Sequence, residues 1–123
     1  MRYLTDRKRA IGKGSAHAGT EHHWYMQASG VGLAILVPIF VVAFGRALGG
    51  TYQEVWAFFS RPFVAITTAL TLVIAMRHFA KGATMMIEDY AHGTLRKALI
   101  ITVIALSYAV TATGLFALGG IAL

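Results

Sequence analysis

The chain has 123 residues, 57% of them hydrophobic and 13% charged, and its mean hydropathy of +0.64 excludes an ordinary soluble domain and indicates a membrane protein. It contains no cysteine, which excludes disulfides, thiol catalysis and iron–sulfur ligation and leaves His, Met or oxygen ligands for any cofactor. The formal net charge is +6, but five of the eleven basic residues lie in the first thirteen positions, so we interpret them as a topology signal and expect no nucleic-acid partner.

A basic tail, residues 1–23, precedes the first apolar segment, which we place at 24–44. This segment is too long for the apolar region of a signal peptide, and no small-x-small cleavage pattern follows a short apolar run, so we expect the chain to keep it. Pro38 lies inside the segment and predicts a bend in the helix.

The second and third apolar segments are placed at 63–87 and 99–118. The polar run TYQEV predicts the connection that leads to the second segment. Ser60 and Pro62 predict the N-cap and the first turn of that helix, and Gly93 predicts its end. In the third segment, small residues recur every four positions and predict a face for close contact with another helix: Ala105, Ala109, Thr113 and Ala117.

Each apolar segment reaches the ~20 residues that a helix needs to cross ~30 Å of hydrocarbon, whereas barrel strands are about half as long and alternate. We therefore predict an all-α membrane protein: a three-transmembrane-helix bundle that forms a single membrane-anchor domain over residues 1–123.

Orientation follows from the lysine and arginine residues, which gather in the tail and around the second connection: Arg2, Arg7, Lys8, Arg9, Lys13, Arg77, Lys81, Arg96 and Lys97. Because basic residues remain on the cytoplasmic side, we expect a cytoplasmic N-terminus and a C-terminus on the opposite side. The pattern fits a multi-pass protein of a bacterial inner (plasma) membrane; a mitochondrial inner membrane is the less favoured variant.

The second helix carries unusually many ionisable residues. A helix over 62–90 measures about 43 Å, so its cytoplasmic end projects beyond the hydrocarbon, and Arg77 and Lys81 share a face from which they can reach lipid phosphates. His78 lies deeper, and Gly82, one turn on, leaves space where a flat macrocycle can approach, since haem iron accepts a neutral imidazole. The alternative, favoured by spacing alone, is that His78 bonds a neighbouring helix and Gly82 lets that helix pack.

Asp89 and Tyr90 at the end of the same helix present a carboxylate and a phenol at the membrane surface. Such groups can hydrogen-bond a quinone and exchange protons with it. The alternative, again favoured without further context, is an interfacial tyrosine beside a solvated helix end.

Taken together, these residues change the balance. A histidine in the second of three spans, followed eleven positions later by Asp-Tyr in the run HFAKGATMMIEDY, resembles the small hydrophobic membrane anchor subunit of succinate dehydrogenase, the succinate:quinone oxidoreductase of respiratory chains. The resemblance covers the whole chain, including the basic N-terminus and the run EHHWYMQASG at the start of the first helix. The spacing from His78 to Tyr90 is its most specific part.

This resemblance implies a bundle that packs with a companion anchor subunit and holds the flavoprotein and iron–sulfur subunits at the membrane. It implies that His78 is an axial ligand to the iron of haem b, with the second axial histidine supplied by the companion anchor. It also implies that Tyr90 hydrogen-bonds ubiquinone and that Asp89 is the acidic neighbour of that site. The chain would then take part in electron transport only as a subunit of the enzyme and would not be catalytic alone.

One position departs from the family pattern. Gln27 stands where family members often have an arginine that helps to hold the haem propionates. Arg77 and Lys81 are candidate replacements, with His22 and His23 as possible hydrogen-bond donors, although contacts with lipid phosphates are an equal alternative for the two cations. Ser29 matches a Ser/Thr often found at its position in the family, and we group it with these propionate or lipid contacts.

Three other functions stay open. The first is the anchor of a quinol:fumarate reductase that works in reverse, with menaquinone. The second is a small membrane transport or channel component in which Arg77, His78 and Asp89 line an ion path. The third is a structural assembly subunit without a cofactor.

Overall fold

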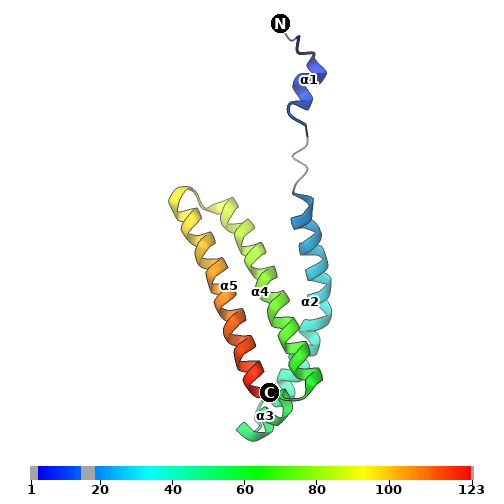
Figure 1. Cartoon of the computed structure of the whole chain (residues 1–123), viewed down its shortest axis with the longest axis vertical. Helices are drawn as coiled ribbons and strands as arrows, with labels where there is room; N and C mark the ends of the chain where they lie inside the picture. Colours follow the sequence, from blue (N-terminus) through cyan, green and yellow to red (C-terminus); the bar gives the residue numbers. More distant parts are fainter. Residues whose placement is uncertain (1–2, 15–18, 123) are drawn as a thin grey trace.

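A computed structural model describes residues 3–14 and 19–122 of the chain, and they form five helices (Figure 1). The helices are α1 (Asp6–Ile11), α2 (Thr20–Ala47), α3 (Tyr52–Phe59), α4 (Pro62–Tyr90) and α5 (Gly93–Ala122). Three of them, α2, α4 and α5, are long and apolar enough to cross a membrane. The prediction of an all-α protein with three membrane-spanning helices is therefore confirmed, and each helix is longer than its predicted apolar segment.

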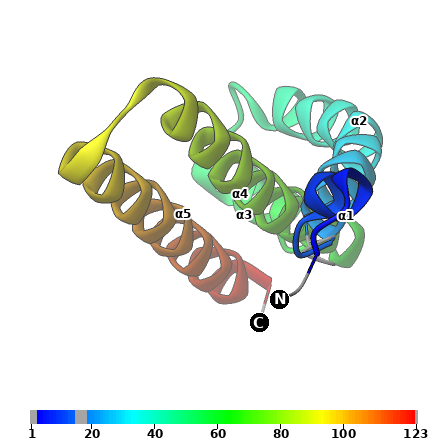
Figure 2. The ribbon, with the colours of Figure 1, turned by 90° about the horizontal axis from the view of Figure 1, so that it is seen from above.

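Helix α4 lies between the other two long helices (Figures 1 and 2). It packs against α2 on one side and α5 on the other, whereas α2 and α5 make no contact with each other within residues 19–122. The second span is thus the only one of the three whose side chains face two neighbours, and this position gives its polar residues partners on both sides.

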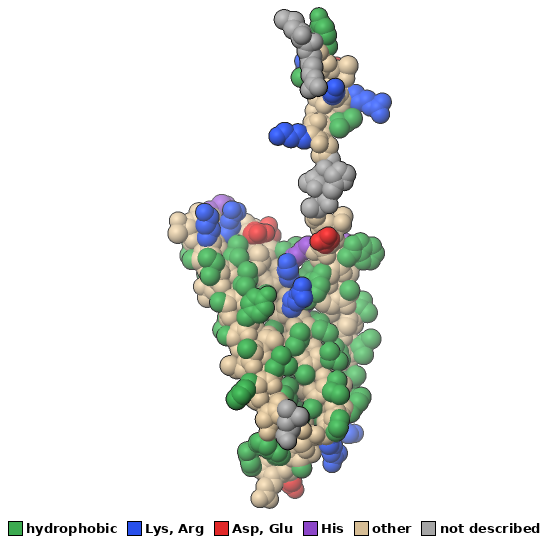
Figure 3. Space-filling model, in the orientation of Figure 1, with side chains coloured by type: hydrophobic (Ala, Val, Ile, Leu, Met, Phe, Trp, Pro, Cys, Tyr) green, Lys and Arg blue, Asp and Glu red, His purple; other side chains and the backbone are tan. Residues whose placement is uncertain are grey.

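The bundle has a thin core. Its buried apolar residues are Val64, Ala65, Ile87 and Ala91, all on α4 or next to its end. Many apolar side chains are open to the surroundings (Figure 3). Val31 of α2 is 67% exposed and Phe116 of α5 is 85% exposed. So much exposed apolar surface is stable only against lipid or other membrane helices.

The contact between α4 and α5 is made through small residues. A Cβ atom at Gly114 would overlap the side chain of Leu72, so the glycine permits the close approach of the two helices. Ser107 is buried and bonds the carbonyl of Val103 in its own helix at 2.8 Å. The small-residue face predicted for the third span lies elsewhere on α5 and is exposed in this chain: Ala105, Ala109, Thr113 and Ala117.

Replacing Gly114 by leucine is expected to destabilise the bundle by about 1–3 kcal/mol, because overpacking forces Leu72 and its helix to move. The measurement is the thermal midpoint of the purified protein in detergent. Gly120→Leu is the matched control on the same helix, since nothing lies within 4 Å of a Cβ atom there. An equal loss of stability in the two variants would show that Gly114 has no special packing role.

The short helix α3 stands where the sequence pattern predicts only a connection. Its start is a capping box: the Thr51 backbone N–H donates to the Glu54 carboxylate at 2.8 Å, and the Glu54 backbone N–H donates to the Thr51 hydroxyl at 3.4 Å. The backbone and hydroxyl hydrogen bonds from Thr51 lower the pKa of Glu54 from its ordinary value of 4.5. The spacing of threonine and glutamate is the signal that identifies this helix.

The roles predicted for Ser60 and Gly93 are wrong, although α4 spans residues 62–90 as expected. Ser60 is the C-cap of α3, with its hydroxyl bonded to the Ala57 carbonyl at 3.1 Å, and the N-cap of α4 is Arg61. Helix α4 ends at Tyr90 with Ala91 as its C-cap, so Gly93 does not stop it; Gly93, whose φ of 61° suits glycine, is the first residue of α5. The first-turn position of Pro62 is confirmed.

Candidate functional site

His78 lies near the middle of α4, half-buried at the contact with α2. Its Nδ1 is 2.8 Å from the Oγ of Ser29, a residue of α2 that is only 8% exposed. A Cβ atom at Gly30 would lie 3.9 Å from the His78 Cε1, so the imidazole sits against a flat, small-residue part of α2. Two residues predicted separately are therefore brought together, and Gly30 joins them as a neighbour that sequence reasoning missed.

The space beside Gly82 is bordered by methionine. A Cβ atom at Gly82 would lie 3.8 Å from the Cε of Met26 on α2. Met26 and Gly30 also line a shallow hollow on α2 together with Gln27, whose side chain is exposed. The surroundings of His78 and Gly82 thus come from one short stretch of α2, which includes the residue that departs from the family pattern.

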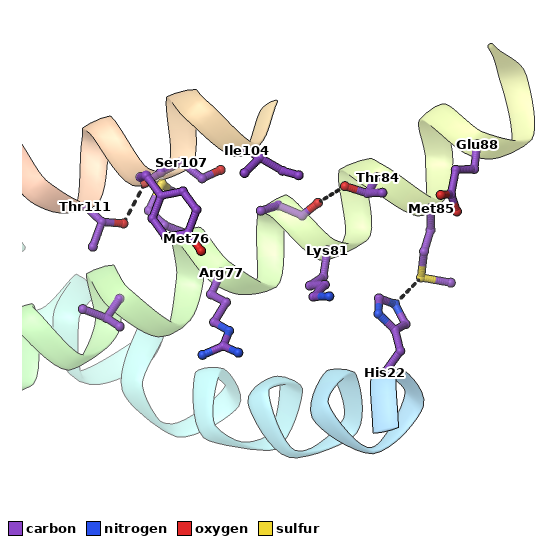
Figure 4. A pocket seen from close by; sticks show the side chains of 13 residues that line it. His22, Met76, Arg77, Lys81, Thr84, Met85, Glu88, Ile104, Ser107 and Thr111 are labelled. Atoms are coloured by element: carbon purple, nitrogen blue, oxygen red, sulfur yellow. Dashed lines mark hydrogen bonds between the residues drawn. The ribbon is translucent and has the colours of Figure 1, made fainter. Parts of the chain in front are cut away.

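Arg77 and Lys81 project from α4 towards α2 (Figure 4). The Arg77 guanidinium lies over the ring of Tyr25 at 4.9 Å, a cation–π contact. In the part of the chain that the structure describes, no carboxylate lies within 4 Å of Arg77 or Lys81, and the ion pair that is present joins Arg9 to Asp6. Glu88 lines the same cavity as these two cations, but it forms no ion pair with either of them.

A cavity of about 770 Å³ is lined by residues of α4, of α5 and of the start of α2, and both cations are among these residues (Figure 4). His22 of α2 lines it as well, with its Nε2 3.0 Å from the Sδ of Met85. His23 is exposed and lies edge-on to Trp24. Of the residues predicted to hold propionates or lipid, the cavity therefore gathers Arg77, Lys81 and His22, whereas His23 and Gln27 are not among its lining residues.

Asp89 and Tyr90 form the exposed end of α4, and Tyr90 is 84% exposed. The buried side chains of Ile87 and Ala91 on either side fix this end against the bundle. Tyr90 lies about 18 Å from His78 along the helix axis. The starts of α2 and α5 lie at the same end of the bundle, where the basic side chains of the second connection also gather (Figures 1 and 3).

The possible metal ligands near His78 suit a metal that is already coordinated by a cofactor better than a bare metal ion. Among residues 3–14 and 19–122, no three His, Cys, Asp or Glu side chains are grouped to hold a bare metal ion. An iron that is already held by a porphyrin, however, needs only a single imidazole from one chain. His78 fits that requirement.

The fold and these residues define a three-helix membrane protein whose central helix carries a half-buried histidine below an Asp-Tyr pair. Residues 1–116 match the family model described as succinate dehydrogenase/fumarate reductase transmembrane subunit. The chain is also 48% identical over 118 residues to the succinate dehydrogenase hydrophobic membrane anchor subunit of Paracoccus denitrificans, a match that covers 96% of this chain and 92% of that relative. No solved structure matches it significantly. The chain therefore belongs to the family of succinate dehydrogenase and fumarate reductase transmembrane subunits, and the resemblance drawn from the sequence is confirmed.

Proposed function

We propose that the chain is the hydrophobic membrane anchor of a succinate dehydrogenase in a bacterial inner membrane. It holds the flavoprotein and iron–sulfur subunits at the membrane, shares haem b with a companion anchor subunit, and forms part of the site that reduces ubiquinone. The observation that carries this proposal is the half-buried His78 on the central helix, below the exposed Asp89–Tyr90 pair at the helix end. The relative from Paracoccus, named for succinate oxidation, supports this direction over fumarate reduction.

In this proposal His78 would hold the iron of haem b from this chain, and a residue of the companion subunit would complete the site. When bound, the haem supplies one-electron redox chemistry. The chain positions the imidazole against Ser29 and Gly30, and Gly82 has no side chain that would fill the space beside the histidine.

Tyr90 holds an oxygen of the ubiquinone headgroup by its phenol, and Asp89 delivers protons to the quinone from the aqueous side. Both side chains are exposed on this chain, which leaves them free to face a substrate and the subunits that dock at this end. In this proposal the same end faces the cytoplasm, because the basic residues of the N-terminal tail and of the second connection favour that side.

Arg77, Lys81 and His22 supply positive charge and hydrogen bonds to an anion, which is a haem propionate or a lipid phosphate. Glu88 lines the same cavity, but no ion pair joins it to either cation within the described residues, so both cations are available to an external anion. Gln27 has no charge to offer, so in this proposal the two cations of α4 replace the arginine that family members often carry.

The test is purification of the tagged chain from its native membrane in a mild detergent. We expect it to bring down a flavin-containing subunit, an iron–sulfur subunit and a second small anchor, together with a haem b band in the reduced-minus-oxidised absorption spectrum. Purified protein without flavin and haem would overturn the proposal and favour a transport or assembly function.

A further inference from the structure

We infer that Ser29 is a positioning residue that fixes the tautomer of the His78 ring: its hydroxyl oxygen accepts a hydrogen bond from Nδ1–H, which leaves Nε2 with the free lone pair. The inference rests on the proposed role of His78 as a haem ligand. It replaces the expectation that Ser29 contacts propionates or lipid, since the serine hydroxyl is buried against α4.

Hydrogen-bond accounting at Ser29 carries the argument. The Ser29 hydroxyl oxygen lies 2.6 Å from the carbonyl oxygen of Tyr25 and 3.2 Å from that of Met26, both in the preceding turn of α2. A carbonyl oxygen can only accept, so the single hydroxyl proton is donated to Tyr25. The third contact, 2.8 Å to the His78 Nδ1, then requires the imidazole to be the donor and the Ser29 oxygen to be the acceptor.

The consequence concerns the other ring nitrogen. A neutral imidazole carries one proton, so with Nδ1 protonated, Nε2 is the unprotonated nitrogen that an iron atom needs. Metal-ligating histidines usually donate their second N–H to a neighbouring oxygen, which fixes the ring and increases the basicity of the ligand. A more basic ligand stabilises the ferric iron and lowers the reduction potential of the haem.

The neighbouring residues help to hold the His78 ring in one orientation. Gly30 presents no side chain to the Cε1 edge of His78, so the ring can lie flat against α2 while its Nδ1 reaches the serine. Arg77, which precedes His78, is held over Tyr25, the residue whose carbonyl accepts the hydrogen bond from the Ser29 hydroxyl. The same turn of α2 therefore orients two consecutive residues of α4.

The experiment compares Ser29→Ala, Ser29→Thr and the wild type in the assembled, purified complex. Ser29→Ala is expected to weaken haem binding by about 10–100-fold, measured as transfer of haem to apomyoglobin, because such outer partners contribute that much to metal-site affinity. In the Ser29→Ala complex, the midpoint potential of the haem is expected to rise and the low-spin electron paramagnetic resonance signal of the haem is expected to shift. Ser29→Thr keeps the hydroxyl and is expected to restore the potential and the signal to wild-type values.

Ser107→Ala is the matched control. Ser107 is also buried, and its hydroxyl also donates a hydrogen bond to the carbonyl four residues earlier. In the described chain, however, Ser107 forms no hydrogen bond with a histidine ring. A midpoint potential in Ser29→Ala equal to those of the wild type and Ser107→Ala would overturn the inference. If haem binding in Ser29→Ala falls while its potential and resonance signal stay at wild-type values, Ser29 has only a packing role and the inference also fails.

A measurement on the unmutated complex remains decisive if Ser29→Ala does not assemble. With ¹⁵N-labelled histidine, proton double-resonance spectra of the oxidised haem are expected to show an exchangeable proton on the Nδ1 of the ligand from this chain. Lack of that proton would overturn the inference while leaving His78 as the ligand. A haem signal unchanged in His78→Leu would instead overturn the proposed role of His78 as the haem ligand, and the inference with it.

Discussion

Replacing His78 by leucine is expected to remove the low-spin haem b signal from the purified complex. The substitution leaves a branched apolar side chain of similar size beside Ser29 and Gly30, so the packing of α4 on α2 is largely kept while the nitrogen ligand is lost. Since even outer-shell partners contribute about 10–100-fold to metal-site affinity, loss of an axial ligand is expected to reduce haem content by at least that much. The measurement is the reduced-minus-oxidised spectrum per mole of flavin.

The matched control is His92→Leu. His92 is an exposed histidine between the end of α4 and the start of α5, and its replacement is expected to leave the haem spectrum unchanged. A His78→Leu complex with an unchanged bis-imidazole spectrum would contradict the ligand assignment. Equal haem loss in both variants would show that the effect is one of assembly and would contradict it too.

Replacing Tyr90 by phenylalanine is expected to slow ubiquinone reduction while leaving succinate oxidation with an artificial acceptor largely intact. The change removes one hydroxyl from a side chain that is 84% exposed at the end of α4, so the fold of the chain is not affected. A single hydrogen bond contributes about 0.5–1.5 kcal/mol, which predicts a roughly two- to tenfold lower kcat/KM for ubiquinone. The two activities are measured on the same preparation.

Tyr52→Phe is the control for Tyr90→Phe. Tyr52 is 76% exposed on α3, at the opposite end of the bundle from Tyr90 (Figure 1), and its replacement is expected to change neither activity. Equal loss of quinone reduction and artificial-acceptor activity in Tyr90→Phe would count against a quinone role for this residue.

The membrane-spanning helices are predictable because their signal is local. Apolar residues in runs long enough to cross a bilayer are visible without any knowledge of packing, and Pro62 marks the start of α4 in the same local way. Helix α3 is equally local, but its polar first turn resembles a loop unless the Thr51–Glu54 pair is considered as a cap.

The arrangement of the three helices is not predictable from periodicity. The apolar residues of α2 and α5 are distributed over every face of each helix, so the sequence of neither helix shows which face meets α4. The regular alanine and threonine spacing on α5 indicates one face, but α4 packs on the face of Ser107 and Gly114 instead. In a membrane, apolar and packed faces have similar composition, so sequence alone does not separate them.

The candidate site is predictable by position and not by contact. The spacing from His78 to Tyr90 follows from one helix and can be read directly. The hydrogen bond between His78 and Ser29 joins two helices through residues that are 49 positions apart in the sequence. The cation–π contact of Arg77 with Tyr25 joins the same two helices. Both depend on the relative rotation of α2 and α4, for which the sequence offers only two small residues, Ser29 and Gly30.

Chemical rescue of His78→Gly tests the central claim most directly, because it asks whether a free imidazole can replace this one side chain. The complex containing this variant is purified and its oxidised haem is followed by electron paramagnetic resonance while imidazole is added. We expect the low-spin bis-imidazole signal to be lost in the variant and to return as imidazole fills the space left beside Ser29. A variant whose signal equals that of the wild type before any imidazole is added would contradict the assignment of His78 as the haem ligand of this chain.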